Sequence, residues 1–230
     1  MPKLFLIPCL LAEDGIDHIP PIAVKTIASL DAFVVEGLRT ARRFIRKMIP
    51  DYNIDGATFV EMDKHDMQVT SKEVALLLKG GKNIGLLSEA GCPCLADPGN
   101  KIVDQARAAG YTISPLTGPT SIVSALISSG YNGQQFTFHG YLPFKEPDLG
   151  KKLQQLNQTV IKTGYTQIWI ETPYRNDKMI EALVKTLPSL TSLTIAIELN
   201  SKKEEILKLN LSQWKGKKIG KRPAVFLMGL

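Results

Sequence analysis

The sequence is short of cysteine and contains no long hydrophobic run, no internal repeat and no low-complexity tract. Its three cysteines are an odd number, and Cys92 and Cys94 stand in a C-x-C arrangement that is typical of neither a disulfide framework nor a zinc site. We therefore expect no bound metal and a reducing, cytoplasmic location. No apolar run approaches the ~18 residues of a membrane span, so we expect no membrane association.

The composition is that of a folded globular protein. Hydrophobic residues make up 44% of the 230 residues and charged residues 22%, which excludes wholesale disorder and a fibrous repeat. This length suits one large domain or two domains of roughly 100 to 130 residues. The apolar stretch 4–12 follows only Met1–Lys3 and is interrupted by Pro8, so a buried strand is a better interpretation than a signal peptide.

The net charge of +6 is concentrated in the second half of the chain. Residues 1–130 contain 13 Lys and Arg against 14 Asp and Glu, or −1, whereas residues 131–230 contain 15 against 8, or +7. A concentrated positive half suits a polyanion such as RNA, because phosphate contacts release counterions. A basic surface that only keeps the protein soluble explains the same composition, so charge alone leaves both alternatives open.

Short apolar runs alternate with amphipathic patterns, which indicates an α/β protein. In the first half we expect strands at residues 3–10, 32–35, 59–62, 84–87 and 111–115, with helices between and after them. This rhythm predicts an N-terminal α/β domain, residues 1–130, with a mostly parallel sheet and flanking helices. The second half predicts a C-terminal α+β domain, residues 131–230, with a mixed sheet of strands near 136–141, 167–170, 193–198 and 224–230.

The stretch from Leu86 to Gly99 is the feature around which the first half is organised. An apolar run ends at Leu87 and opens into Ser88-Glu89-Ala90-Gly91-Cys92-Pro93 and then Asp97-Pro98-Gly99, a loop rich in glycine, proline and carboxylates. Open α/β sheets bind their ligands in such loops, at the carboxyl ends of their strands. We therefore predict that this loop forms the floor of a cofactor site.

Several short motifs in this order resemble those of the tetrapyrrole methylase superfamily. The central loop is followed by Gly118-Pro119-Thr120-Ser121, Gly140-Tyr141-Leu142-Pro143, Glu171-Thr172-Pro173-Tyr174-Arg175 and Glu198-Leu199. Within the superfamily these motifs are most similar to the branch of ribosomal small-subunit cytidine 2′-O-methyltransferases. The corresponding motifs of that branch are S-D-A-G-T-P, S-D-P-G, P-G-P, G-F-L-P, S-P-H-R and E-L-T.

The resemblance implies a methyltransferase that binds S-adenosylmethionine in a cleft between two α/β domains, and a homodimer. Neither the superfamily nor this sequence has a glycine-rich dinucleotide fingerprint, because a sulfonium cofactor has no pyrophosphate for such a loop to hold. Matched by position, the cofactor-binding residues are Pro8, Leu87, Ser88, Glu89, Gly91, Cys92, Thr120 and Ser121 in the first domain and Glu171, Pro223 and Ala224 in the second. Turn or packing roles explain Pro8, Cys92 and Pro223 nearly as well.

The substrate side departs from the resembling branch. Where the branch has A-E-D-T-R and H-N-E, this sequence has Val35-Glu36-Gly37-Leu38-Arg39 and His65-Asp66-Met67, so two carboxylates are missing. Methyl transfer to a ribose hydroxyl needs alignment of the reacting groups and a group that accepts the hydroxyl proton. The candidates for substrate positioning or proton acceptance, which we group as catalytic, are Glu36, Arg39, His65 and Asp66.

Three functions remain open at the level of the sequence. The first is S-adenosylmethionine-dependent 2′-O-methylation of a ribose in small-subunit ribosomal RNA. The second is methylation of a tetrapyrrole or another small molecule by the same cofactor, and the third is a noncatalytic RNA-binding relative that keeps the fold. The basic second half favours RNA over a small molecule. After the first strand the branch has T-P-I-G-N-L, where this sequence has Ile7-Pro8-Cys9-Leu10-Leu11-Ala12. The altered loops after the first two strands are compatible with lost chemistry.

Overall fold

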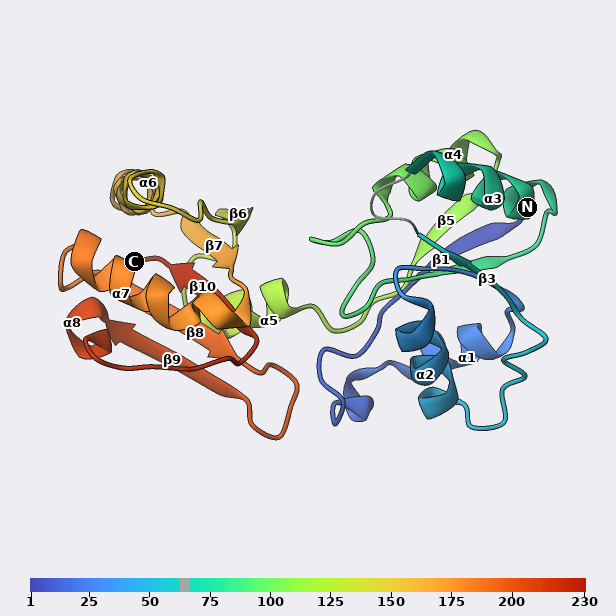
Figure 1. Ribbon diagram of the computed structural model, residues 1–230, viewed down its shortest axis with the longest axis horizontal. Coiled ribbons are helices and arrows are strands. Elements are labelled where there is room, and N and C mark those ends of the chain that lie inside the picture. The colour runs from blue at the N-terminus through green and yellow to red at the C-terminus, as the bar shows by residue number, and fades with distance from the viewer. Residues whose placement is uncertain (63–66) are drawn as a thin grey trace. The chain divides into compact units, whose positions relative to one another are not determined.

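The chain divides into two compact units, Met1–Thr120 and Ser121–Leu230, in a computed structural model that describes residues 1–62 and 67–230 (Figure 1). The boundary follows residue 120 rather than residue 130, which corrects the expected domain limits. The physical reason is that helix α5 (Ser121–Ser129) packs on strands of the second unit, where the ammonium of Lys208 donates to the carbonyl of Ser129 at 3.1 Å. Residues 121–130 carry no charge, so the net charges of −1 and +7 still apply to the two units.

The first unit is a parallel five-stranded sheet with helices on both faces. The strand order is β3-β2-β4-β1-β5, and every neighbouring pair is parallel. The strands are β1 (Lys3–Ile7), β2 (Ala32–Val35), β3 (Thr58–Glu61), β4 (Ile84–Leu87) and β5 (Thr112–Pro115). The helices are α1 (Pro21–Ala28), α2 (Leu38–Met48), α3 (Met67–Lys79) and α4 (Asn100–Ala108), and Ile16–His18 forms a short 3-10 turn. The expected parallel sheet is confirmed.

Two apolar cores hold the helices against this sheet. Phe33 and Leu87 belong to the core that includes α1 and α2, whereas Val34 and Leu86 belong to the core that includes α3 and α4. Figure 1 shows α1 and α2 on one face of the sheet and α3 and α4 on the other. Strands that are buried on both faces read as continuous apolar runs, which is why residues 32–35 show no polar alternation.

The second unit contains a mixed five-stranded sheet in the order β6-β7-β10-β8-β9. β6 (Phe136–Tyr141) and β7 (Thr166–Ile170) are parallel, and the other pairs are antiparallel. The remaining strands are β8 (Ser192–Ile197), β9 (Glu205–Asn210) and β10 (Ala224–Met228). The helices are α6 (Asp148–Thr163), α7 (Asn176–Thr186) and α8 (Leu211–Trp214), with a 3-10 turn at Pro173–Arg175. The expected mixed sheet is confirmed.

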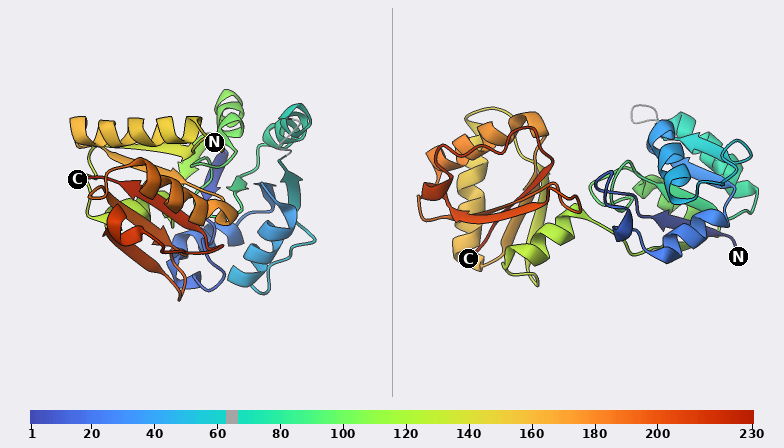
Figure 2. Two further views of the ribbon diagram at one scale, coloured as in Figure 1. Left: turned by 60° about the vertical axis from the view of Figure 1, so that its left-hand side comes forward. Right: turned by 90° about the horizontal axis from the view of Figure 1, so that it is seen from below.

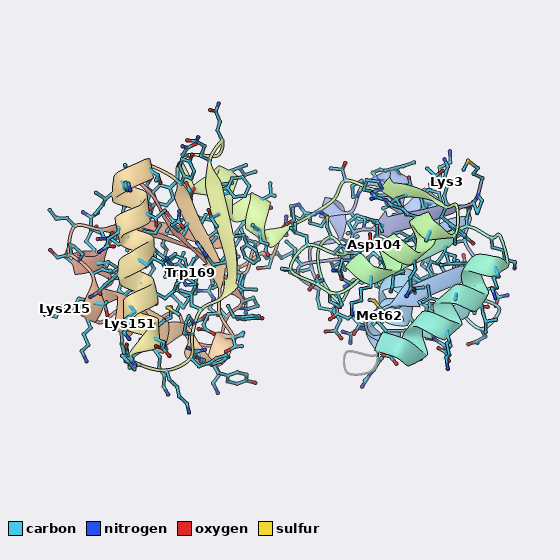
Figure 3. All side chains as sticks on the ribbon, turned by 90° about the horizontal axis from the view of Figure 1, so that it is seen from above. Lys3, Met62, Asp104, Lys151, Trp169 and Lys215 are labelled. Carbon is cyan, nitrogen blue, oxygen red and sulfur yellow. The ribbon has the colours of Figure 1, made fainter. Side chains whose placement is uncertain are left out.

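One large core fixes α6, α7 and α8 to this sheet, and α5 contacts β8, β9 and β10. The long helix α6, yellow in Figure 2, lies along the sheet. Trp169 lies in the interior, with its ring stacked on that of Phe226 at 5.7 Å, whereas Lys151 and Lys215 lie at the surface (Figure 3). None of the helices in the described part of the chain has the length and hydrophobicity that crossing a membrane requires.

We predict that Phe33→Ala lowers the free energy of unfolding by ~3–5 kcal/mol, because it leaves a cavity between the rings of Tyr52 and Phe59. The matched control is Ile22→Ala on the exposed face of α1, with an expected change of about 0.5 kcal/mol. Urea denaturation followed by circular dichroism measures both variants. Equal losses in the two variants would contradict this packing.

Candidate functional site

The carboxyl ends of the parallel strands bring most of the predicted residues of the first unit to one edge. The strand registers place the last residue of β4 opposite the last residues of β1 and β2. The residues that follow, Pro8, Glu36 and Ser88, therefore lie at the same edge, and β5 extends this row beyond β1 towards Thr120. The chain leaves β1 and β4 in opposite directions along the sheet, which is the arrangement that opens a ligand crevice between two neighbouring strands.

Two loops that are distant in the sequence touch at this edge. The thiol of Cys92 lies 3.8 Å from the carbonyl oxygen of Gly118 and 3.5 Å from that of Pro119. Cys9 and Gly91 exchange two backbone hydrogen bonds, with N–O distances of 2.8 and 3.2 Å. The loop after β4 is thus attached both to the end of β1 and to the loop after β5.

Glycines make this close approach possible. A Cβ added to Gly118 would lie 2.2 Å from the Cβ of Pro8, so only glycine lets the loop after β5 rest on the end of β1. Gly91 has φ +70°, a left-handed conformation that side chains rarely adopt. The backbone groups of both loops therefore lie close together, which is the arrangement that a compact ligand without phosphates can use.

A pair of carboxylates lies beside these loops. Glu36 accepts a hydrogen bond through Oε2 from the backbone N–H of Glu89 at 3.0 Å, so it positions the loop after β4. A Cβ added to Gly37 would lie 2.6 Å from Oε1 of Glu89. The Glu89 carboxylate therefore occupies the space beside the position where the resembling branch has Asp. Among the described residues, none donates a hydrogen bond to this exposed carboxylate.

The three cysteines near this edge are protonated at neutral pH. Burial raises the pKa of the Cys9 thiol far above its usual value, and the carboxylate of Asp97 adds to this effect. Burial also raises the pKa values of Cys92 and Cys94, which are half-buried. Since the thiolate is the reactive form, none of the three is poised as a nucleophile.

A pocket of about 180 Å³ lies next to Glu89, between the loop after β1, helix α2 and the loop after β4. Its charged lining includes Glu13, which forms ion pairs with Arg43 at 2.6 Å and with Lys47 at 3.1 Å. The hydrogen bond from Lys47 and the charge of Arg43 lower the pKa of Glu13. The predicted residue Arg39 lies in the first turn of α2 and is exposed.

The second unit places its predicted residues at the carboxyl end of β7. Val225 of β10 pairs with Ile170 of β7, so Ala224 lies beside Glu171, and Pro223 precedes it. Glu171 is buried and accepts a hydrogen bond from the backbone N–H of Thr172 at 2.8 Å. Glu171 also forms an ion pair with Arg175, with an N–O distance of 3.3 Å.

Three further predicted residues stand apart from these groups. Ser121 is the first residue of α5 and belongs to the second unit. His65 and Asp66 lie outside the described residues. In the described part of the chain, no group of three or more His, Cys, Asp or Glu is arranged to hold a metal ion.

Sequence reasoning missed the contributions of Gly37 and of the charged residues that line the pocket. The comparison of motifs shows Gly37 only as a lost carboxylate, although a glycine at the end of a strand also signals close approach by another group. Glu13 and Lys47 are 34 residues apart, so no local pattern connects them.

The fold and these loops define a class of two-unit α/β proteins in which loops meet at the carboxyl edge of a parallel sheet. The family model of Tetrapyrrole (Corrin/Porphyrin) Methylases matches residues 14–214, and the chain belongs to this family. Two solved structures share the fold. "Crystal structure of the methyltransferase CobJ" has a TM-score of 0.65 and 14% identity, and covers 100% of this chain and 94% of that chain. A conserved hypothetical protein, APE0931 from Aeropyrum pernix K1, has a TM-score of 0.71 and 12% identity, with 99% and 84% covered.

Curated relatives named "Ribosomal RNA small subunit methyltransferase I" are similar along most of the chain. The protein from Vibrio cholerae is 31% identical over 212 residues, which covers 92% of this chain and 70% of that protein. The protein from Bacillus subtilis is 31% identical over 191 residues, which covers 83% and 62%. The chain therefore spans between 62% and 70% of the length of these two relatives. The resemblance noted in the sequence motifs is confirmed.

We predict that iodoacetamide modifies Cys92 and Cys94 in the folded protein but leaves Cys9 unmodified. Because burial raises all three pKa values, the thiolate fraction at pH ~8 is below that of a free cysteine, and modification accelerates as the pH rises further. Mass spectrometry of tryptic peptides measures each site. Protein unfolded in urea is the control and should react at all three sites. Equal rates at Cys9 and Cys92 in the folded protein would contradict the assigned burial.

Proposed function

We propose that this chain is an S-adenosylmethionine-dependent methyltransferase that methylates a ribose 2′-hydroxyl in small-subunit ribosomal RNA. The observation that carries the proposal is the similarity to relatives with the printed name of ribosomal RNA small subunit methyltransferases, together with membership of a methylase family. The net charge of +7 on the second unit supports a polyanionic substrate. We extend the proposal to a homodimer in the cytoplasm.

The residues at the edge of the first unit fit this cofactor. S-adenosylmethionine supplies a methyl group that is already activated on a positively charged sulfur. Glycine turns bring backbone groups of the two loops together without a phosphate-binding fingerprint, and the Glu89 carboxylate is available to ribose hydroxyls or to positive charge. The residues that would hold the cofactor here are Pro8, Leu87, Ser88, Glu89, Gly91, Cys92 and Thr120. Cofactor roles for Ser121, Glu171, Pro223 and Ala224 stay predictions for the second unit.

Methyl transfer at this edge needs the protein to align the ribose hydroxyl with the methyl group and to provide a group that accepts the hydroxyl proton. Glu36 holds the backbone of Glu89 in place, which assigns it a positioning role for the loop. No described residue donates a hydrogen bond to the neighbouring carboxylate of Glu89, which lines the pocket beside α2. We propose this carboxylate as the proton acceptor. We place the acceptor nucleotide on the side of this pocket. Arg39, His65 and Asp66 stay candidates for contacts with the substrate.

A noncatalytic RNA-binding relative is the second candidate, and Gly37 favours it because a carboxylate of the resembling branch is absent there. Transfer of a labelled methyl group from S-adenosylmethionine to small-subunit ribosomal RNA, mapped to one ribose, decides between the candidates. We expect transfer by the wild-type chain. Tight cofactor binding without transfer to RNA would instead favour the noncatalytic relative, and transfer only to a tetrapyrrole would establish a small-molecule methyltransferase.

We predict that Thr120→Trp abolishes binding of S-adenosylhomocysteine, because the indole fills space where the loop after β5 meets the loop after β4. Thr120 follows Pro119, whose carbonyl oxygen lies 3.5 Å from the thiol of Cys92. Thr112→Trp is the matched control, since Thr112 is exposed at the opposite end of β5 and should leave the affinity within about twofold. Isothermal titration calorimetry measures both variants. Normal affinity in Thr120→Trp would remove the loop after β5 from the cofactor site.

A further inference from the structure

The second unit exposes three aromatic side chains near one edge of its sheet. Tyr141, Phe144 and Tyr174 are 57%, 65% and 76% exposed. Large aromatic side chains usually bury most of their surface, and a group of exposed ones marks a binding surface. Their position follows from topology, because β6 and β7 are parallel neighbours and the chain leaves both at the same edge.

The two most exposed of these rings, Phe144 and Tyr174, each have a cation over them. The guanidinium carbon of Arg175 lies 4.1 Å from the ring centroid of Phe144, and the ammonium of Lys221 lies 5.0 Å from that of Tyr174. Arg175 is held in place by its ion pair with the buried Glu171 and by the carbonyl of Phe144 at 3.4 Å from its terminal nitrogen. Positive charge and aromatic surface are therefore built together, which is the combination that binds nucleic acid.

Hydrogen bonds also hold the lysine-rich loop of residues 215–222 against the start of α7, next to Tyr174 and Arg175. The fully buried Asn176 donates two hydrogen bonds from Nδ2, to the carbonyl of Gly220 at 3.0 Å and to that of Arg222 at 2.7 Å. Asp177 accepts hydrogen bonds from the backbone N–H groups of Ile219 and Gly220, at 2.9 and 3.1 Å. Both residues begin α7, directly after the turn that contains Tyr174. The exposed lysines of this loop are Lys215, Lys217, Lys218 and Lys221.

We propose that this surface, the aromatic–basic platform of Phe144, Tyr174, Arg175 and Lys221, binds single-stranded RNA by stacking unpaired bases on its rings while the lysine loop contacts phosphates. The inference rests on the proposed function and gives the RNA a defined place on the second unit. Double-helical RNA hides its base faces, so an unpaired segment is the form that stacks. Lysines are depleted at protein–protein interfaces, and the second unit carries the whole basic surplus, which favours RNA over a protein partner.

Fluorescence anisotropy with a labelled, unstructured RNA of about 12 nucleotides tests the stacking. Tyr174→Ala should raise the Kd by about tenfold, whereas Tyr174→Phe should stay within about twofold because stacking needs the ring and not the hydroxyl. The matched control is Tyr165→Ala, since Tyr165 precedes β7 at the opposite end of that strand. An unchanged Kd in Tyr174→Ala, or an equal loss in Tyr165→Ala, would overturn the platform.

The salt dependence of the RNA affinity distinguishes the contribution of the Lys221 charge from that of the Tyr174 ring. Lys221→Gln should lower the slope of log Kd against log salt by about 1, whereas Tyr174→Ala should leave the slope unchanged. An unchanged slope in Lys221→Gln would overturn the phosphate role of the loop. Titration of S-adenosylhomocysteine into the same variants should give wild-type affinity, so a failure of the platform is distinguished from a failure of the proposed cofactor chemistry. Loss of a dimer in Tyr174→Ala, seen by sedimentation with unchanged RNA affinity, would make the surface a protein interface.

Discussion

The parallel register of β1, β2 and β4 is the constraint on which the rest of the first unit depends. It places the last residues of three neighbouring strands side by side, so the loops that follow must meet at one edge. Gly118 resting on Pro8 and Gly91 paired with Cys9 then close the loops onto each other. A single residue of slip in this register would turn the apolar side chains to the opposite faces of the sheet and separate the loops. The buried cores on both faces prevent that slip.

The second unit also has two parallel neighbouring strands, but the loops after them carry aromatic and basic side chains. Its two parallel strands, β6 and β7, also leave the sheet at one edge, where the buried Glu171 orients Arg175 and Asn176 fixes the backbone of the lysine loop. The ion pair between Glu171 and Arg175 and the two hydrogen bonds donated by Asn176 hold these groups in one conformation, so the cations over the exposed rings are positioned before any ligand arrives. We propose that most cofactor contacts and the acceptor nucleotide belong to the first unit, whereas the second unit, with its net charge of +7, adds the platform for unpaired RNA.

Much of the fold could be predicted from the sequence because hydrophobic periodicity is local. The expected limits of β2, β4 and β6 agree with the structure. The sequence analysis does not predict β9, because its mixed polar and apolar residues at the edge of the sheet are defined as a strand by pairing with β8. The domain boundary was misplaced because α5 shows only its amphipathic pattern and not the sheet on which it packs. Contacts such as Glu89 over Gly37 and Lys221 over Tyr174 join residues more than 40 positions apart, which no local pattern records.

We propose that the loops after β4 and β5 form one site for an adenosyl sulfonium cofactor. Hydrogen–deuterium exchange with and without S-adenosylhomocysteine tests whether they do, because it reports on each backbone segment separately. We expect slower exchange at residues 88–92 and 117–120 together when the ligand is bound. Binding that leaves both segments unprotected, or that protects only one of them, would contradict it.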